Sequence, residues 1–334
     1  MAAPAASTVG GLVFADPALE ASVRAGLDRV EARLRAATTS EFGFVTEAAR
    51  HLVQAGGKRF RPLLALLAAH FGDPTADGVV ESAAVVELTH LATLYHDDVM
   101  DEATARRGAV SANSRWGNTV AILTGDFLFA RASDMISELG PDAVRVQART
   151  FARLVTGQIR ETAGPADNED PIDHHLLVLA QKTGSLIATS AYFGAWFASV
   201  PAPQAEALRR YGEVVGIAFQ LSDDLLDITA ERSESGKVPG TDLREGIPTL
   251  PALFALRGAD AEGTRLRELL SGPVPEASID EALTLLRESP AVDAARDVLR
   301  SYAEQARALL TDLPDVPARA ALEALADFVV SRTA

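Results

Sequence analysis

The sequence predicts an all-α protein with one large buried core. Apolar residues recur at helical spacing through most of the 334 residues, and no region is rich in strand-like sequence. Hydrophobic residues make up 48% of the chain and aromatic residues only 6%, while alanine and leucine are plentiful. This composition favours helices over sheets, and it is typical of a globular protein.

The helices are expected to follow one another with short breaks from residue 16 onward. Gly56 and Gly57 end one helix, and Pro62 fits the first turn of the next. Pro201 and Pro203 break the most apolar helix. The expected helices span residues 16–37, 43–55, 59–71, 78–101, 113–137, 141–163, 171–198, 203–228, 246–256, 260–271, 276–287, 291–310 and 316–332.

The simplest organisation is a flexible N-terminal tail, residues 1–15, followed by one domain at 16–334. Residues 231–247 are polar and contain several glycines, so we expect a mobile loop there. Residues 183–205 lack charged side chains over a length that could span a bilayer. Their polar and proline residues favour a helix buried inside a bundle, so no membrane span is expected.

Charge and composition exclude several classes of protein. The net charge of −15 argues against nucleic acid as a general partner, because an acidic chain repels polyanions. The absence of cysteine excludes disulfides, zinc–thiolate sites and cysteine nucleophiles. The first residues lack the basic region of a signal peptide, so a cytoplasmic location is expected.

Two acidic motifs of the form DDxxD begin at Asp97 and at Asp223. On a helix, Asp97 and Asp101 share one face, with Cβ atoms about 6 Å apart, and Asp98 flanks that face. The second motif repeats this spacing through Asp227. Carboxylates in this arrangement match the preference of Mg²⁺ for a few carboxylates, water and phosphate oxygens.

A solvated acidic helix end would explain either acidic motif alone. Both motifs, however, follow strongly apolar helical sequence, where carboxylates are costly unless a metal ion or another cation neutralises them. Neither motif has the alternating acidic loop of an EF-hand. Two such motifs in one chain therefore favour a metal site.

Basic residues form two clusters that indicate an anionic ligand. Lys58, Arg59 and Arg61 lie at a predicted helix N-terminus, where backbone N–H groups attract phosphate. Arg106 and Arg107 follow the first acidic motif directly. A solvated basic turn or a surface ion pair would explain either cluster by itself.

Three further residues are candidates for binding a diphosphate. Lys182 and Lys237 could contact phosphate, although each alone is more often a surface lysine. His90 lies seven residues before Asp97, two helical turns back on nearly the same face. It could hydrogen-bond a diphosphate, or it could be a satisfied core histidine.

Taken together, these segments resemble the trans-isoprenyl diphosphate synthase, or polyprenyl synthetase, family. The resemblance covers most of the chain, and the ordered set is far more specific than any single motif. The matching segments are GGKRFRP at 56–62, ELTHLATLYHDDVMDEATARRG at 87–108, GNTVAILTGDFLFARA at 117–132, QKTGSLI at 181–187, GIAFQLSDDLLD at 216–227 and GKVPGTDLREGIPTLP at 236–251. The resemblance implies the isoprenoid synthase fold, a single large helical bundle around a central apolar cavity, and usually a homodimer.

The resemblance also implies roles for individual residues. Isopentenyl diphosphate would be held by Lys58, Arg61, His90 and Arg107. Several Mg²⁺ ions on the allylic diphosphate would be held by Asp97, Asp101, Asp223 and Asp227. Contacts to the allylic diphosphate or to the developing cation are implied for Arg106, Lys182, Thr183, Gln220 and Lys237. The residues implied in catalysis are Asp97, Asp98, Asp101, Arg106, Lys182, Asp223 and Lys237.

The implied reaction is head-to-tail prenyl transfer to an all-trans product. Pyrophosphate leaves the allylic substrate, and the double bond of isopentenyl diphosphate attacks the resulting carbocation, which an apolar cavity shields from water. Two positions depart from the family pattern. Ile247 stands where the family often has lysine, which leaves Lys237 in that segment, and His175 stands where it often has tyrosine.

Product length is expected to depend on the helix before the first acidic motif. Ala92, Leu88 and Val85 lie five, nine and twelve residues before Asp97, on roughly one face, with about 5.4 Å of depth per turn. In the family, an aromatic residue at the Ala92 position stops chain growth early. Alanine there predicts a product longer than C20, unless another side chain closes the tunnel. The alternative is a plain packing alanine.

Several other functions are compatible with parts of the pattern. A geranylgeranyl or farnesyl diphosphate synthase of the same family is the main alternative. A class I terpene cyclase needs one diphosphate site, whereas this chain has a second basic site. A non-catalytic partner subunit should have lost its metal carboxylates, and a generic metal-binding helical protein would not need the basic clusters.

Overall fold

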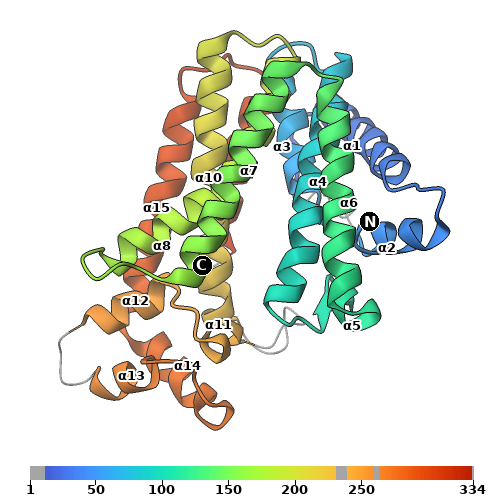
Figure 1. The fold of residues 1–334 in the computed structure, drawn as a ribbon. Coiled ribbons are helices and arrows are strands. Elements are labelled where there is room, and N and C mark those ends of the chain that lie inside the picture. The colour runs from blue at the N-terminus through green and yellow to red at the C-terminus, as the bar shows by residue number, and fades with distance from the viewer. Residues whose placement is uncertain (1–11, 231–238, 259–262, 333–334) are drawn as a thin grey trace, which may run out of the picture. The chain divides into compact units, whose positions relative to one another are not determined.

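The computed structural model describes residues 12–230, 239–258 and 263–332, and it confirms a predominantly helical chain (Figure 1). The chain divides into two compact units, each described here by itself. Unit 1 comprises Met1–Phe151, Leu186–Gly212 and Asp312–Leu322, and unit 2 comprises Ala152–Ser185, Glu213–Thr311 and Glu323–Ala334.

The elements follow one another in the order shown by the labels of Figure 1. They are α1 (Pro17–Ala37), α2 (Gly43–Gln54), α3 (Phe60–Ala69), α4 (Asp77–Met100), β1 (Ala105–Arg106), β2 (Ala109–Val110), α5 (Ala112–Trp116), α6 (Asn118–Ser137), α7 (Pro141–Ala163), α8 (Pro171–Leu179), η1 (Ala180–Gly184), α9 (Ser185–Phe197), α10 (Ala202–Thr229), α11 (Thr241–Glu245), α12 (Leu250–Arg257), α13 (Thr264–Leu269), η2 (Glu276–Ser278), α14 (Ile279–Glu288), α15 (Pro290–Leu310) and α16 (Pro317–Ser331). The boundaries between the two units fall inside α7, α10 and α16, at the start of α9 and just after α15.

The core of unit 1 is built around α4, most of whose apolar residues are buried. Val86, Leu88 and Leu91 are fully buried. α4 packs along α6 and against α3 (Figure 1). The first acidic motif therefore lies at the C-terminal end of a deeply buried helix.

The uncharged stretch at 183–205 forms a buried helix, as the sequence predicts. α9 packs so closely on α3 that a Cβ at Gly194 would lie 1.9 Å from the carbonyl oxygen of Ala65. Its polar side chains find partners inside unit 1, since the hydroxyl oxygens of Thr150 and Thr189 lie 2.7 Å apart. Among the described residues, no helix combines the length and the apolar character that crossing a bilayer requires.

α10 carries the second acidic motif, and its C-terminal half packs into the core of unit 2. Leu221, Leu225 and Ile228 are buried in an apolar cluster with residues of α12, α14 and α15. Arg287 holds the end of α10, because its Nε donates to the carbonyl oxygen of Ile228 at 2.7 Å. A cation at this position satisfies a carbonyl group near the helix end and complements the helix dipole.

A short hairpin after the first acidic motif was not expected from the sequence. β1 and β2 pair antiparallel, with Arg106 opposite Ala109. Arg107 and Gly108 both have positive φ, 54° and 76°, which is the backbone of a tight two-residue hairpin turn. Arginine rarely adopts this conformation, so its sequence carries no turn signal here.

Three helix boundaries also correct the expectation. The helix expected at 113–137 is broken between α5 and α6 by Gly117, whose φ is 87°. The helix expected at 171–198 runs through the π-helical turn η1. Residues 231–238 of the loop expected at 231–247 lie outside the described residues, and its remaining part contains α11. α12 begins later than expected because Gly246 has a left-handed backbone, with a φ of 72°.

The expected division into a tail at 1–15 and one domain at 16–334 stays a prediction. Residues 1–11 lie outside the described residues. In the described part of the expected tail, residues 12–15, Leu12 and Phe14 are buried, so this part is packed against the protein.

Candidate active site

The first acidic motif presents two carboxylates from the last turn of α4. Asp101 caps the helix and donates its N–H to the carbonyl oxygen of Asp97 at 2.8 Å, which places the two residues one turn apart. Asp101 is exposed and Asp97 is half-buried. Nη2 of Arg106 lies 3.7 Å from Oδ2 of Asp101. This turn carries the hard oxygen ligands that a divalent cation prefers.

Asp98, the middle carboxylate, points into the protein. Its side chain is fully buried, and its Oδ1 accepts a hydrogen bond from Nε of Arg106 at 2.6 Å. The hairpin makes this contact, because it returns Arg106 to the end of α4. Oδ2 of Asp98 is also buried and has no hydrogen-bond donor within the described residues. Asp98 therefore positions Arg106, and its second oxygen can accept one more donor or cation.

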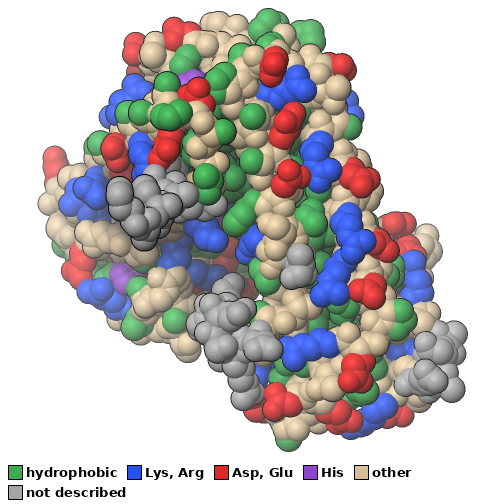
Figure 2. All heavy atoms as spheres, turned by 180° about the vertical axis from the view of Figure 1, so that it is seen from behind, with side chains coloured by type: hydrophobic (Ala, Val, Ile, Leu, Met, Phe, Trp, Pro, Cys, Tyr) green, Lys and Arg blue, Asp and Glu red, His purple; other side chains and the backbone are tan. Residues whose placement is uncertain are grey.

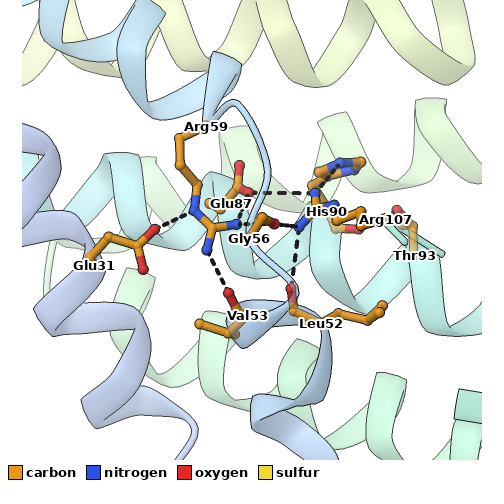
Figure 3. Close-up of polar contacts among 9 residues, drawn as sticks. All are labelled: Glu31, Leu52, Val53, Gly56, Arg59, Glu87, His90, Thr93 and Arg107. Atoms are coloured by element: carbon orange, nitrogen blue, oxygen red, sulfur yellow. Dashed lines mark hydrogen bonds and ion pairs between the residues drawn. The ribbon is translucent and has the colours of Figure 1, made fainter. Parts of the chain in front are cut away.

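Arg59 holds the loop between α2 and α3 in place (Figure 3). Its side chain is only 8% exposed, and its guanidinium donates to the carbonyl oxygens of Val53 at 3.0 Å and Gly56 at 3.3 Å. It also donates to Glu87 Oε1 at 3.1 Å and pairs with Glu31. Burial lowers the pKa of Arg59, but the contacts with Glu31 and Glu87 outweigh burial, so the pKa lies above its usual value. The charge of Arg59 is therefore neutralised by carboxylates of the protein itself.

Arg107 joins the same loop from the hairpin turn (Figure 3). Its Nη1 donates to the carbonyl oxygen of Gly56 at 2.5 Å, and its Nη2 lies 3.5 Å from Nε2 of His90. A Cβ at Gly57 would lie 2.9 Å from Cζ of Arg107. Because Gly57 also has a φ of 136°, both the backbone and the arginine contact require glycine there.

Arg61, Arg107 and His90 form a group whose positive charge is incompletely compensated. Burial lowers the pKa of Arg61 to about 10, Glu87 offsets part of the shift, and the charge of Arg107 adds to it. Nε of Arg61 is buried and has no hydrogen-bond partner in the described part of the chain. Burial, together with the charges of Arg61 and Arg107, holds the pKa of His90 well below its usual range. Lys58, nearby in the chain, is exposed. Lowered pKa values in such a group mark a place where an anion would be stabilised.

The second acidic motif, in unit 2, pairs with an arginine from the end of the chain. Nη2 of Arg332 donates to Oδ1 of Asp223 at 2.6 Å. Asp224 is buried and accepts a hydrogen bond from Nε2 of Gln220 at 3.1 Å. Nε2 of His175 lies 3.3 Å from Oδ2 of Asp224. Gln220 and His175 therefore lie against the acidic motif itself.

Asp227 holds the start of α11. Its two carboxylate oxygens accept the backbone N–H groups of Thr241 at 3.2 Å and Asp242 at 3.1 Å. Its own carbonyl oxygen accepts the N–H of Gly240 at 2.9 Å. A carboxylate is favourable at a helix N-terminus, so Asp227 positions the segment that follows α10. The metal-binding role expected for Asp227 stays a prediction.

Lys182 and Thr183 lie in the π-helical turn η1. Nζ of Lys182 donates to Oε2 of Glu161 at 2.5 Å. α7 approaches this turn so closely that a Cβ at Gly157 would lie 2.6 Å from the backbone nitrogen of Lys182. Single π-helical turns inside helices are frequent at functional sites. Lys237 lies outside the described residues.

Known proteins share this sequence over nearly its whole length. The chain matches the polyprenyl synthetase family over residues 43–286. It belongs to this family. It is 53% identical to nonaprenyl diphosphate synthase of Mycobacterium tuberculosis, with 98% of both chains covered. It is 43% identical to dimethylallyltranstransferase of the same organism, over 95% of this chain and 97% of the relative.

Solved structures of polyprenyl synthetases agree with the all-α fold. A geranylgeranyl pyrophosphate synthase from Corynebacterium glutamicum, complexed with calcium and isoprenyl diphosphate, matches with a TM-score of 0.87 and 46% identity, over 96% of this chain and 99% of that chain. A decaprenyl diphosphate synthase from Rhodobacter capsulatus matches with a TM-score of 0.87 and 34% identity, over 95% and 99%.

In this polyprenyl synthetase, the residues expected to govern product length lie buried on α4. Ala92, Leu88 and Val85 are each at most 1% exposed. α6 approaches closely at this level, because a Cβ at Gly125 would lie 3.0 Å from the carbonyl oxygen of Ala92. Their role in product length stays a prediction.

The acidic motifs fit a metal ion that binds together with a diphosphate. Within the described ranges, no group of three or more histidine, aspartate or glutamate side chains is arranged to hold a metal ion by itself. Carboxylate oxygens such as those of Asp101 and phosphate oxygens are both ligands that a divalent cation prefers.

Three contributors to the site were missed in the sequence. Glu31 and Glu87 neutralise Arg59, and Arg332 pairs with Asp223. Glu87 does carry a signal, because it is a carboxylate inside the apolar run VVELTHL. Arg332 carries none, since its contact joins residues 109 positions apart.

Proposed function

We propose that this polyprenyl synthetase joins isopentenyl diphosphate head to tail to an allylic diphosphate and makes an all-trans product longer than C20. The proposal rests on the arrangement of α4. Nε2 of His90 lies 3.5 Å from Nη2 of Arg107, and Asp97 begins the acidic motif seven residues later, about 10 Å along the helix. A cationic site beside α4 and a carboxylate site at the C-terminal end of α4 fit two diphosphates, one bound directly and one bound through metal ions.

Isopentenyl diphosphate is assigned to the cationic site. Arg61 and Arg107 offer charge-assisted hydrogen bonds to its phosphate oxygens, and Lys58 is exposed nearby. His90, which is neutral at neutral pH, can donate an N–H without adding charge. A bound anion would favour the charged form of both arginines, whose pKa values are lowered in its absence.

The allylic diphosphate is assigned to the carboxylate site with divalent cations, for which we propose Mg²⁺. The calcium and isoprenyl diphosphate in the C. glutamicum structure support the use of a divalent cation. When bound, such cations stabilise the negative charge of the departing pyrophosphate. The residues assigned to this substrate and its metal ions are Asp97, Asp101, Asp223, Asp227, Arg106, Lys182, Thr183, Gln220 and Lys237.

The reaction needs little acid–base help from side chains. The C–O bond of the allylic diphosphate breaks, and the double bond of isopentenyl diphosphate forms a new C–C bond to the allylic cation. A proton then leaves the adjacent carbon, and we assign the departing pyrophosphate as its acceptor. Arg106 is oriented by buried Asp98, so it can stabilise charge without first reorganising.

Product length beyond C20 is supported by one residue and by two relatives. Ala92 is small and buried, and we assign it to the wall of the tunnel that holds the growing tail. Two relatives, from M. tuberculosis and R. capsulatus, are named nonaprenyl and decaprenyl diphosphate synthase, which are names of long products. The geranylgeranyl pyrophosphate synthase of C. glutamicum represents the shorter alternative.

Product analysis tests the proposal. The purified protein is incubated with Mg²⁺, labelled isopentenyl diphosphate and, in turn, geranyl, farnesyl or geranylgeranyl diphosphate. We expect labelled polyprenyl products longer than C20 on reversed-phase chromatography. Products that stop at C20 would refute the proposed length. Consumption of an allylic diphosphate without isopentenyl diphosphate would indicate a terpene cyclase. The homodimer and the cytoplasmic location stay predictions.

A further inference from the structure

Arg332, the last described residue, is built into the second acidic motif. Its Nη2 donates to Oδ1 of Asp223 at 2.6 Å, and its side chain is only 16% exposed. The guanidinium also contacts two aromatic faces, since its Cζ lies over the ring of Phe219, 4.8 Å from the ring centre, and over that of Phe328 at 5.9 Å. Such cation–π contacts can keep the guanidinium in place even when its carboxylate partner moves.

The hydrogen bonding of Arg332 is incomplete. An arginine that only closes an ion pair commonly uses two parallel N–H donors on one carboxylate. Here Nη1 of Arg332 is buried and has no hydrogen-bond partner within the described residues. The side chain of Asp223 remains 32% exposed. A hydrogen-bond donor therefore remains unused beside a partly exposed carboxylate, and such a group calls for an explanation.

We infer that Arg332 makes metal binding by Asp223 conditional on a bound diphosphate. This inference rests on the proposed function, because it takes Asp223 as a metal ligand. A guanidinium on the carboxylate repels a free divalent cation and competes with it for the same oxygen. A diphosphate brings enough negative charge to offset the guanidinium, and its oxygens can accept the hydrogen bond of Nη1. Arg332 is thus a positioning residue that couples metal and diphosphate binding.

Manganese binding to the full-length protein tests the coupling without turnover. Mn²⁺ is titrated and followed by electron paramagnetic resonance, with and without inorganic pyrophosphate as the probe. Arg332→Gln should bind Mn²⁺ alone roughly tenfold more tightly than the unmodified protein, because one repulsive charge is removed. Pyrophosphate should then increase its Mn²⁺ affinity less than it does in the unmodified protein. Arg332→Lys retains the charge and should stay close to the unmodified protein.

Arg307→Gln is the matched control. Arg307 pairs with Asp327 at 2.8 Å, also in unit 2, and both side chains are exposed, so its loss should leave Mn²⁺ binding unchanged. A chain that ends after Ser331 should repeat the result of Arg332→Gln if that variant unfolds. Unchanged or weaker Mn²⁺ binding by the folded Arg332→Gln protein would overturn the inference. If Asp223→Asn leaves pyrophosphate-dependent Mn²⁺ binding intact, the metal role of Asp223 fails instead.

Discussion

Three arginines, Arg59, Arg61 and Arg107, divide two tasks between them. Arg59 is neutralised by Glu31 and Glu87 and shapes the loop, whereas Arg61 and Arg107 retain charge that a ligand can compensate. The difference comes from burial and partners, because the side chains are chemically identical. Loss of Arg59 should therefore damage folding, while loss of either of the others should damage binding of isopentenyl diphosphate.

Gly57→Ala should weaken the binding of isopentenyl diphosphate. The new methyl group would displace the guanidinium of Arg107, and we expect the KM for isopentenyl diphosphate to rise about tenfold, in line with ~1–3 kcal/mol of local strain. Steady-state kinetics with both substrates measures the change, and the KM for the allylic substrate should move little.

Gly56→Ala is the control for backbone strain. Gly56 also has positive φ, 82°, but a Cβ there meets no atom within 4 Å. It should therefore lower stability while affecting the KM for isopentenyl diphosphate less. Equal effects of the two substitutions would show that the contact between Gly57 and Arg107 does not matter for binding.

His90 should make stability fall in acid. Its pKa is lowered in the folded state, so the unfolded chain binds the proton more readily. The stabilising contribution is fully present above the unfolded pKa of about 6.5 and is lost as the pH falls toward the folded pKa. Urea unfolding between pH 7 and pH 5 should show a steeper loss of stability for the unmodified protein than for His90→Gln. Parallel losses would contradict this prediction.

At the scale of elements, α4 carries many of the proposed site residues of unit 1. His90, Ala92 and the first acidic motif follow one another along this helix. One rigid helix therefore fixes the spacing between the proposed tail tunnel, His90 of the cationic site and the carboxylates of the acidic motif. Close packing against α6 at Gly125 limits how far α4 can shift.

Ala92→Tyr should shorten the product. A tyrosine at this level would block the growing tail, and Ala92→Ser, which stays small, should leave the product unchanged. Reversed-phase analysis of products and thermal unfolding should be measured together, because overpacking a filled core costs about 1–3 kcal/mol. If a stable Ala92→Tyr protein makes the same products as the unmodified protein, the proposal that Ala92 on α4 lines the tunnel is wrong.

Most elements could be predicted from the sequence, because apolar periodicity and glycine or proline breaks mark them. α1, α2, α4, α7 and α15 begin and end within about one residue of the expected positions, a usual uncertainty for helix ends. The hairpin could not be predicted, since arginine is no turn signal and the contact of Arg107 with Gly56 joins residues 51 positions apart. Periodicity also placed Asp98 and Asp227 on helix faces without showing that one is buried and the other caps α11.

The whole molecule carries a net charge of −15, yet both proposed substrates are polyanions. Basic and acidic side chains are interspersed on the face shown in Figure 2, so local groups and not the total charge must attract the diphosphates. The two substrates are then bound by different means, one by side-chain cations and the other with the help of metal ions.

Removal of divalent cations should separate the two substrates. With EDTA, turnover and the binding of an allylic diphosphate should be lost, whereas isopentenyl diphosphate should still bind, because its proposed site uses arginine and lysine. Calorimetric titration of each substrate measures this, and added Mg²⁺ should restore the lost binding. Equal loss of both substrates would contradict separate modes of binding.

The two-residue turn between β1 and β2 limits how this protein can be altered. Arg106 and Arg107 are neighbours, yet one reaches Asp98 and the other reaches Gly56. Inserting or deleting a single residue there would detach at least one of these anchors, since the register of a tight hairpin is fixed by its length. A library that randomises the length of this turn should therefore recover active variants only at the present length.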